Sequence, residues 1–313
     1  MTEEAETSTP PPPPLTPIVR VQRAINFQYD LQKMRVAAGN RATGGAADAH
    51  LDKEDKAFLD RVKVGLETLE KDVFKYVGRR VKAVPIYQKW LQEQRGVGPM
   101  MAAVLISKID IHKADTVSKI WKYAGLDVME NGQGRRRVKG QKANYNPWLK
   151  TKLVKVLADC FIKGYSVDED GAYYFKRKGA RVYWRGPKDN EADPETGAAF
   201  PWRKVYDGYK HRKKSQIVDP CMLCKGSGVY PPPKDWALGN AKPKPTEKSR
   251  CTNCQGTGIG PWGKSDAHRD AAARRYMIKM FLIELHKQWR TLEGLEVRPP
   301  YYVEKLGMAS HGG

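Results

Sequence analysis

The chain lacks the long apolar runs of membrane proteins, because no stretch approaches the roughly 18 consecutive apolar residues of a membrane-spanning helix. Met1 to Glu6 is acidic and leads into prolines 10–14, so the pattern of a secretory signal is missing as well. Cysteine is scarce, with five residues in 313. In a chain without a secretion signal, such cysteines indicate metal binding rather than a disulfide framework. We therefore expect a cytoplasmic protein in a reducing compartment.

Negative charge is also in short supply. Lys and Arg number 56 against 35 Asp and Glu, which gives a net charge of +21. The positive charges repel one another and destabilise the compact chain unless an anionic partner offsets them. Nucleic acid is a suitable partner, because each contact between a cation and a phosphate releases condensed counterions. An anionic membrane would require an apolar anchor or a basic amphipathic helix. We predict DNA as the partner, with RNA as the second candidate and no membrane. A merely solvated basic surface is the alternative.

Helical periodicity dominates the sequence, so we predict a mainly α fold. Changes in composition divide the chain into six segments. These are a disordered Pro-rich tail (1–17), a helical, coiled-coil-like arm with a flexible linker (18–85), a helical domain (86–214), a cysteine-rich insertion (215–264), a closing helix (265–292) and a second tail (293–313).

The arm is predicted to contain a short helix from Ile18 to Arg35, a Gly/Ala-rich linker from Ala37 to Ala47, and a long helix over 51–82. Apolar residues recur every three or four positions in the long helix, with charged residues between them. This stripe comprises Phe58, Val62, Leu66, Leu69, Val73 and Val77. It is typical of a coiled-coil seam that would form a homodimer, or of one face of a helical core, and both interpretations stay open.

A Gly-Val-Gly-Pro turn stands between two apolar helical segments. Gly96 and Gly98 allow positive backbone angles and close approach of a ligand, while Val97 is expected to pack between the helices. The second helix, Met100 to Ile109, presents free backbone N–H groups that suit a phosphate. We predict a helix-hairpin-helix element that contacts nucleic acid through Arg95, Gly96, Val97 and Gly98. An ordinary tight turn between packed helices is the alternative.

Three short motifs resemble the C-terminal transposase domain of the IS110/IS116 insertion-sequence family. They are Arg95-Gly-Val-Gly-Pro-Met-Met-Ala-Ala103, Ile120-Trp-Lys-Tyr-Ala-Gly-Leu126 and Gly132-Gln-Gly-Arg-Arg-Arg137. The resemblance extends over about 86–165 and the closing helix. It implies a helix-hairpin-helix, transposase-like domain over 86–214 and a DNA-binding, nucleoid-associated protein of DNA transposition, recombination or maintenance.

The resemblance also implies a catalytic serine and an acidic RNase-H-like domain, and the sequence departs from the family at both. Gln133 stands at the serine's position, and no serine occurs between Ser118 and Ser166. An amide cannot attack a phosphodiester as an activated hydroxyl can. No succession of apolar strands precedes Pro85. We therefore predict no catalytic residues; an active transposase with another nucleophile or a separate catalytic subunit, and a zinc-dependent protein-binding adaptor, are the alternatives.

Two copies of Cys-x-x-Cys-x-Gly-x-Gly occur, at 221–228 and 251–258. Four thiolates form a closed tetrahedral zinc site, which leaves no position for a catalytic water. We predict that Cys221, Cys224, Cys251 and Cys254 bind one structural Zn²⁺ in a zinc-ribbon insertion. The glycine pattern resembles the cysteine-rich region of Hsp40 (DnaJ-type) co-chaperones, which have four such repeats and two zinc ions. Cys160, on an apolar helix, is predicted to be a buried core residue.

Three basic stretches, at 135–152, 176–188 and 203–214, include aromatic residues on which unpaired bases can stack. The first contains no acid. Its predicted nucleic-acid contacts are Arg135, Arg136, Arg137, Lys139, Lys142 and Lys150. The alternative is that the rings belong to the core and the cations form a solvated face.

Overall fold

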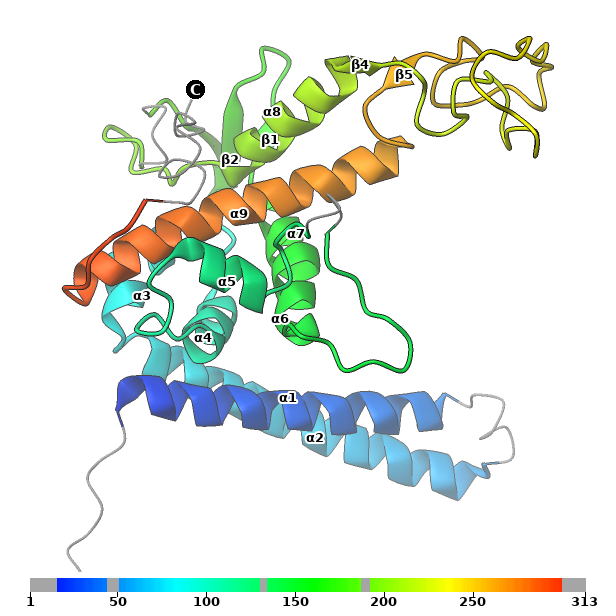
Figure 1. The fold of residues 1–313 in the computed structure, drawn as a ribbon. Coiled ribbons are helices and arrows are strands. Elements are labelled where there is room, and N and C mark those ends of the chain that lie inside the picture. Colours follow the sequence, from blue (N-terminus) through cyan, green and yellow to red (C-terminus); the bar gives the residue numbers. More distant parts are fainter. Residues whose placement is uncertain (1–15, 44–50, 130–133, 187–191, 300–313) are drawn as a thin grey trace, which may run out of the picture. The chain divides into compact units, whose positions relative to one another are not determined.

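The computed structural model describes residues 16–43, 51–129, 134–186 and 192–299, and these residues form two compact units. Unit 1 comprises the chain up to Leu91 together with Gly98–Asp110, and unit 2 comprises Gln92–Val97 and the chain from Ile111 onward. Helices make up most of the described structure, so the predicted mainly α fold is confirmed (Figure 1). No helix in these four ranges is long and apolar enough to cross a membrane.

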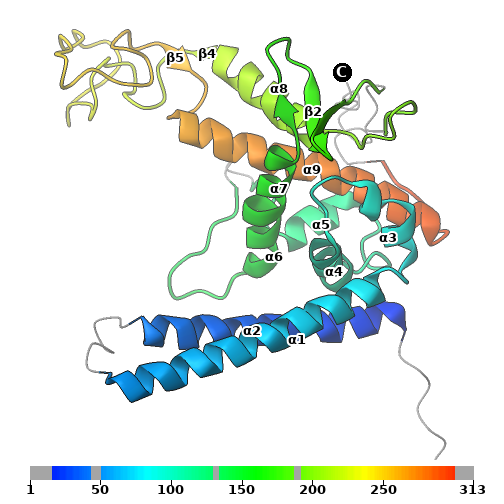
Figure 2. The same ribbon diagram turned by 180° about the vertical axis from the view of Figure 1, so that it is seen from behind.

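Unit 1 is built on a hairpin of two long helices, α1 (Pro17–Ala42) and α2 (Lys53–Val81), which lie side by side (Figures 1 and 2). Each begins at a capping side chain that accepts a backbone N–H, Thr16 in α1 and Asp52 in α2. Helix α1 continues through 37–42, where the sequence predicts a flexible linker. The rest of that linker, and the predicted tail up to residue 15, lie outside the described residues.

A buried ionic group fixes the pairing of α1 with α2. Glu70 is 6% exposed. Its Oε1 accepts a hydrogen bond from Gln28 Nε2 at 2.9 Å, and its Oε2 accepts one from Arg35 Nε at 2.6 Å. A buried carboxylate without such partners is strongly destabilising, so these contacts favour one axial register of the two helices.

The predicted apolar stripe of α2 is covered only towards its C-terminal end. Val77 is fully buried, whereas Phe58 and Leu69 are 56% and 54% exposed. Phe27 and Met34 of α1 are exposed to a similar extent. The stripe is therefore a helix face that unit 1 does not fill, and its use as a coiled-coil seam stays a prediction.

Three short elements follow: α3 (Pro85–Lys89), the 3₁₀ turn η1 (Leu91–Glu93) and α4 (Pro99–Lys108). Helix α4 is apolar around its whole circumference and is buried from Met101 to Ile106, where it packs against α1 and α2. A helix that is hydrophobic on all sides is stable only inside a core. The core of unit 1 therefore lies where α4 meets the α1–α2 hairpin.

Unit 2 is organised around α9 (Asp266–Leu292), which begins at the cap Ser265 and corresponds to the predicted closing helix. The other helices are α5 (Val117–Tyr123), α6 (Pro147–Thr151), the π-helix η2 (Lys152–Leu157), α7 (Ala158–Gly164) and α8 (Trp202–Ser215). Phe161 of α7, Trp202 of α8 and Phe281 of α9 form an aromatic cluster with ring centroids 5.0–5.9 Å apart. This cluster is the centre of the unit 2 core.

Two small antiparallel sheets complete unit 2. The first has the order β1 (Ser166–Val167), β2 (Tyr173–Arg177), β3 (Ala180–Tyr183), and it lies within the segment 86–214 that is predicted to be a helical domain. The second pairs β4 (Ile217–Val218) with β5 (Gly260–Pro261), at the two ends of the cysteine segment.

Candidate metal centre and nucleic-acid interface

The four predicted ligand cysteines come together in unit 2. Their Sγ atoms all lie within 4.8 Å of one another, and the four residues are buried. Two come from the turn after β4 and two from the turn before β5, so the short sheet brings the two turns together. This arrangement can hold one metal ion.

The two cysteine turns bind each other symmetrically. Cys221 N donates to Gly258 O at 2.7 Å, and Cys251 N donates to Gly228 O at 2.9 Å. The N–H of Gly228 donates to Cys224 Sγ, and the N–H of Gly258 donates to Cys254 Sγ, both at 3.3 Å. A Cβ at Gly228 or Gly258 would overlap a backbone carbonyl of the opposite turn. The second glycine of each motif is therefore required for the turns to meet.

The donor set and its surroundings fit a metal bound by four thiolates. Burial and the neighbouring thiols of Cys254 and Cys221 raise the pKa of Cys251 to about 12. Burial would also raise the pKa of Cys221, but hydrogen bonds from Asn253 Nδ2 and from backbone N–H groups lower it to about 7. Metal binding would displace the remaining protons, because only thiolates are ligands. With all four positions taken by cysteine, such a site has a structural role.

The two glycines of the predicted hairpin have different environments. Gly96 has a φ of +100°, and a Cβ there would lie 3.0 Å from the carbonyl oxygen of Cys160. Gly98 is the N-cap of α4 with a φ of −74°, and a Cβ there would meet no atom within 4 Å. Val97 is buried, as predicted. Packing against α7 therefore explains Gly96, whereas the exposed N-terminus of α4 leaves Gly98 open to a ligand.

Arg95, a predicted nucleic-acid contact, is held in place by the fold. Its Nε donates to Gly164 O at 2.5 Å, and its guanidinium group lies 3.8 Å from the ring centroid of Phe175.

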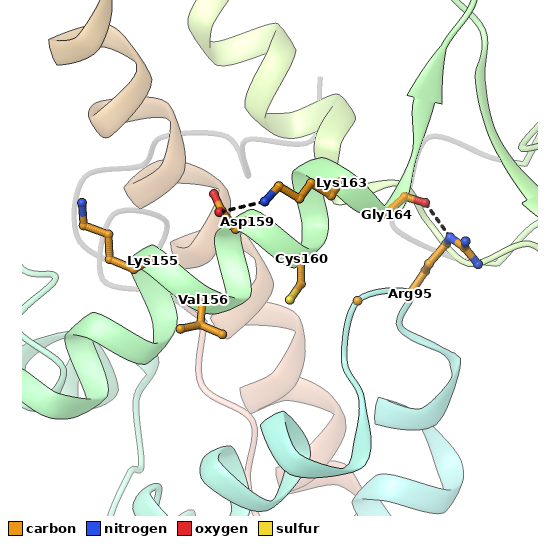
Figure 3. A pocket seen from close by; sticks show the side chains of 8 residues that line it. Arg95, Lys155, Val156, Asp159, Cys160, Lys163 and Gly164 are labelled. Atoms are coloured by element: carbon orange, nitrogen blue, oxygen red, sulfur yellow. Dashed lines mark hydrogen bonds and ion pairs between the residues drawn. The ribbon is translucent and has the colours of Figure 1, made fainter. Parts of the chain in front are cut away.

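Arg95 borders a hollow of about 710 Å³ between the turn at Gly96 and the helices η2 and α7 (Figure 3). Cys160 also lines this hollow and is partly exposed, so its prediction as a buried core residue was wrong. Burial nevertheless raises the pKa of its thiol.

The first basic stretch contains cations that bind other parts of the fold and cations that are exposed. Arg135 Nε binds both oxygens of Asp127 at 2.7 Å, and Lys150 Nζ donates to Arg135 O at 2.7 Å. These two residues hold the ends of the loop. The exposed cations of the loop are Arg136, Arg137, Lys139 and Lys142. Gln133, at the position of the family serine, lies outside the described residues.

Two cations of α9, Arg275 and Lys279, were missed by sequence reasoning. Burial lowers the pKa values of Lys150, Arg275 and Lys279, and the positive charges of neighbouring arginines lower them further. Lys279 Nζ also lies 4.9 Å from the ring centroid of Trp121. In the part of the chain that the structure describes, no carboxylate forms an ion pair with Arg275 or Lys279, although Asp127 stabilises the charge on Lys279. We call Arg136, Lys150, Arg275 and Lys279 the cation cluster.

The aromatic residues of the basic stretches include both buried rings and partly exposed rings. Trp184 and Tyr206 are buried; Trp184 packs edge-on against Phe200, and the Tyr206 hydroxyl binds Asp270. For these two rings the core interpretation holds. Tyr209 is partly exposed and stacks on Tyr276 of α9, with ring centroids 4.5 Å apart.

Residues 88–166 match the family model described as "Transposase IS116/IS110/IS902 family". The matched segment contains the hairpin turn, α4 to α7 and the first basic loop. No curated protein and no solved structure matched the chain. Over residues 88–166 this protein is similar to the transposases of that family, and the similarity supports a transposase-related role.

Proposed function

We propose that this protein binds the phosphate backbone of DNA in transposition or recombination, without cutting the strands itself. The observation that carries the proposal is the cation cluster. Three of its members are half-buried, and their pKa values are lowered, so the fold holds positive charge where water cannot fully solvate it. A bound phosphate offsets this cost, and the transposase similarity favours DNA as its source.

The loop 134–146 extends the proposed surface of unit 2, and the start of α4 in unit 1 offers a separate site for phosphate. Arg136, Arg137, Lys139 and Lys142 are exposed on the loop, where long cationic side chains can reach phosphates. Gly98 leaves the first N–H groups of α4 accessible, and such groups bind phosphate oxygens. These contacts touch backbone rather than base edges, so we expect binding that is largely independent of sequence.

The metal in the cysteine module is proposed to be Zn²⁺. Four thiolates in a closed site favour zinc among the common divalent ions. Hydrogen bonds to the sulfur atoms from Gly228, Gly258 and Asn253 orient the ligands in the manner of other thiolate sites. The ion would keep the two turns together and stabilise the segment that leads into α9.

Self-association through α1 and α2 is proposed from the exposed stripe. The exposed side chains of Phe27, Met34, Phe58 and Leu69 leave apolar surface on these helices that a second copy could cover.

The family similarity favours a second candidate function, an active transposase in which another residue or subunit supplies the nucleophile. Strand cleavage separates this candidate from the first.

The test is a salt titration of DNA binding, measured by the fluorescence anisotropy of a labelled duplex. With six to ten phosphate contacts, affinity should fall by roughly 10³ to 10⁵ between about 50 and 200 mM salt. The double variant Arg275→Gln/Lys279→Gln should weaken binding, whereas the matched control Lys53→Gln/Lys56→Gln on α2 should not. Salt-insensitive binding, or equal affinity of both variants, would refute the proposal.

A further inference from the structure

Beyond Tyr173 and Tyr174, which pair with β1, strands β2 and β3 continue as a two-stranded ribbon that lies outside the segment matched by the family model. Lys176 pairs with Arg181 and Arg177 with Ala180, and the strands are joined by Lys178 and Gly179. Both turn residues have positive φ, at 49° and 85°, as a two-residue hairpin turn of the tight, twisted type requires. The ribbon projects from unit 2 in both views (Figures 1 and 2).

One face of the ribbon is anchored at its base. Tyr173 donates its hydroxyl to Asp207 Oδ2 at 3.1 Å. Phe175 packs edge-on against Tyr165, with ring centroids 5.5 Å apart, and Arg95 lies over the Phe175 ring. Since these contacts join the ribbon to α7, α8 and the turn at Arg95, its base is fixed while its tip extends into solvent.

The opposite face and the tip carry positive charge and aromatic rings. Tyr174 and Tyr183 face each other across the strands, with ring centroids 5.4 Å apart, and Arg181 lies 4.8 Å over Tyr174. The exposed cations are Lys176, Arg177, Lys178 and Arg181. No acidic residue occurs between 171 and 188. The acids of 168–170 lie in the turn between β1 and β2, at the end of the ribbon away from its tip.

We propose that the β2–β3 ribbon enters the major groove of duplex DNA and contacts phosphates on both sides of it. The major groove of B-form DNA is about 12 Å wide and admits a two-stranded ribbon, whose strands lie about 4.8 Å apart. The A-form groove of duplex RNA is too deep and narrow for side chains to read. Charges on both strands and at the turn suit a groove with a phosphate backbone along each edge.

This inference rests on the proposed DNA binding and names the element that enters the groove. The test variant is Lys176→Gln/Arg177→Gln/Lys178→Asn, which removes three charges and places at 178 a residue that tolerates positive φ. Arg181 is retained because it packs on the tyrosine pair. The matched control, Lys53→Gln/Lys56→Gln/Lys71→Gln, removes three exposed charges from α2. Circular dichroism spectra that match the unaltered protein establish that both variants fold.

The readouts are the salt dependence of duplex binding and the protection of guanine N7, a major-groove atom, from dimethyl sulfate. Loss of three phosphate contacts should reduce the slope of log affinity against log salt by about 2.7, at 0.9 per contact. N7 protection should disappear in the ribbon variant and persist in the control. Unchanged slope and protection in the ribbon variant would overturn the inference, as would an equal loss of binding to duplex RNA.

Failure of the inference differs from failure of the proposed function. If the unaltered protein shows no salt-sensitive DNA binding, both are refuted. If it binds, and Arg275→Gln/Lys279→Gln weakens binding while the ribbon variant does not, only the role of the ribbon is refuted. If the ribbon variant instead loses an acidic protein partner and keeps its DNA affinity, the ribbon is a protein-binding element and the inference is again overturned.

Discussion

The backbone of Gly96 lies directly against that of Cys160, so close that a single methyl group on Gly96 would come within 3.0 Å of the Cys160 carbonyl oxygen. Gly98, two residues later, has no neighbour of this kind. The contact separates a glycine that the fold requires from one that a ligand can use.

Gly96→Ala is therefore expected to destabilise unit 2. The substitution combines steric overlap with a φ that L-residues rarely adopt, a strain that costs on the order of 1–3 kcal/mol. Gly98→Ser is expected to leave stability unchanged or to raise it by roughly a few tenths of a kcal/mol, because serine is a slightly better N-cap than glycine. The same Gly98→Ser change should weaken DNA binding by crowding the start of α4. Urea unfolding and anisotropy check the two effects, and a Gly98→Ser protein with full DNA affinity would show that the start of α4 does not contact DNA.

The purified protein is expected to contain one zinc ion per chain. Cys224→Ser or Cys254→Ser should lose the metal, because each removes one of four ligands from a closed site. Cys160→Ser is the matched control, since Cys160 lies outside the cluster and should leave metal content unchanged. Elemental analysis measures the number of zinc ions per protein chain. A value of zero or two in the unaltered protein would contradict a single four-thiolate site.

Mild acid is expected to destabilise unit 2 through His286. Burial lowers the pKa of His286, and nearby Arg290 lowers it further. Its Nε2 lies 2.9 Å from the carbonyl oxygen of Ala114, which also accepts from Arg290. Since the unfolded chain binds the proton more tightly, stability is lost as the pH falls below the unfolded pKa of about 6.5.

Urea unfolding at about pH 7 and about pH 5 measures this loss. The variant His286→Gln cannot titrate there, so its stability should depend less on pH than that of the unaltered protein. The pKa of His268 is also lowered by burial and by neighbouring cations, so part of the dependence should remain. An identical pH dependence in both proteins would show that His286 is not responsible.

The protein is not expected to nick or recombine supercoiled plasmid in the presence of Mg²⁺ or Mn²⁺. Gln133 stands where the resemblance places a serine, and an amide does not act as a nucleophile on phosphorus. Gel electrophoresis of the plasmid, with and without added RNA, provides the measurement. Cleavage that disappears on substitution of one Ser, Asp or Glu would instead establish the active-transposase alternative.

The cysteine module shows what could be predicted from the sequence. Its four ligands fall in two eight-residue segments with the same Cys-x-x-Cys-x-Gly-x-Gly pattern, so the ligand set is visible without knowledge of the fold. The closing helix over 265–292 is likewise predicted from a local pattern, its helical periodicity, and in the structure it begins at the cap Ser265. The charge pattern alone was less informative. Arg95 and Arg135 were predicted to meet phosphate, but their partners, Gly164 and Asp127, become apparent only when the chain is folded.

The sequence also fails to reveal candidate functional residues that only folding brings together. Arg275 lies far along the chain from Arg136 and Lys150, so no local pattern relates the three before α9 packs. The ribbon, by contrast, had a usable signal. Tyr173 to Arg177 is rich in aromatic residues and precedes a Lys-Gly turn, which is typical of a hairpin.

Because the two cysteine turns hydrogen-bond to each other, the segment between them is not needed to hold them together. Tyr230 N donates to Ser249 O, so the segment leaves and returns at nearly the same point. Doubling the length of a flexible loop costs only about 0.6 kcal/mol in closure entropy. We therefore expect residues 231–248 to contain a site that tolerates an inserted sequence, such as a fluorescent reporter or an affinity tag, while the metal site stays assembled.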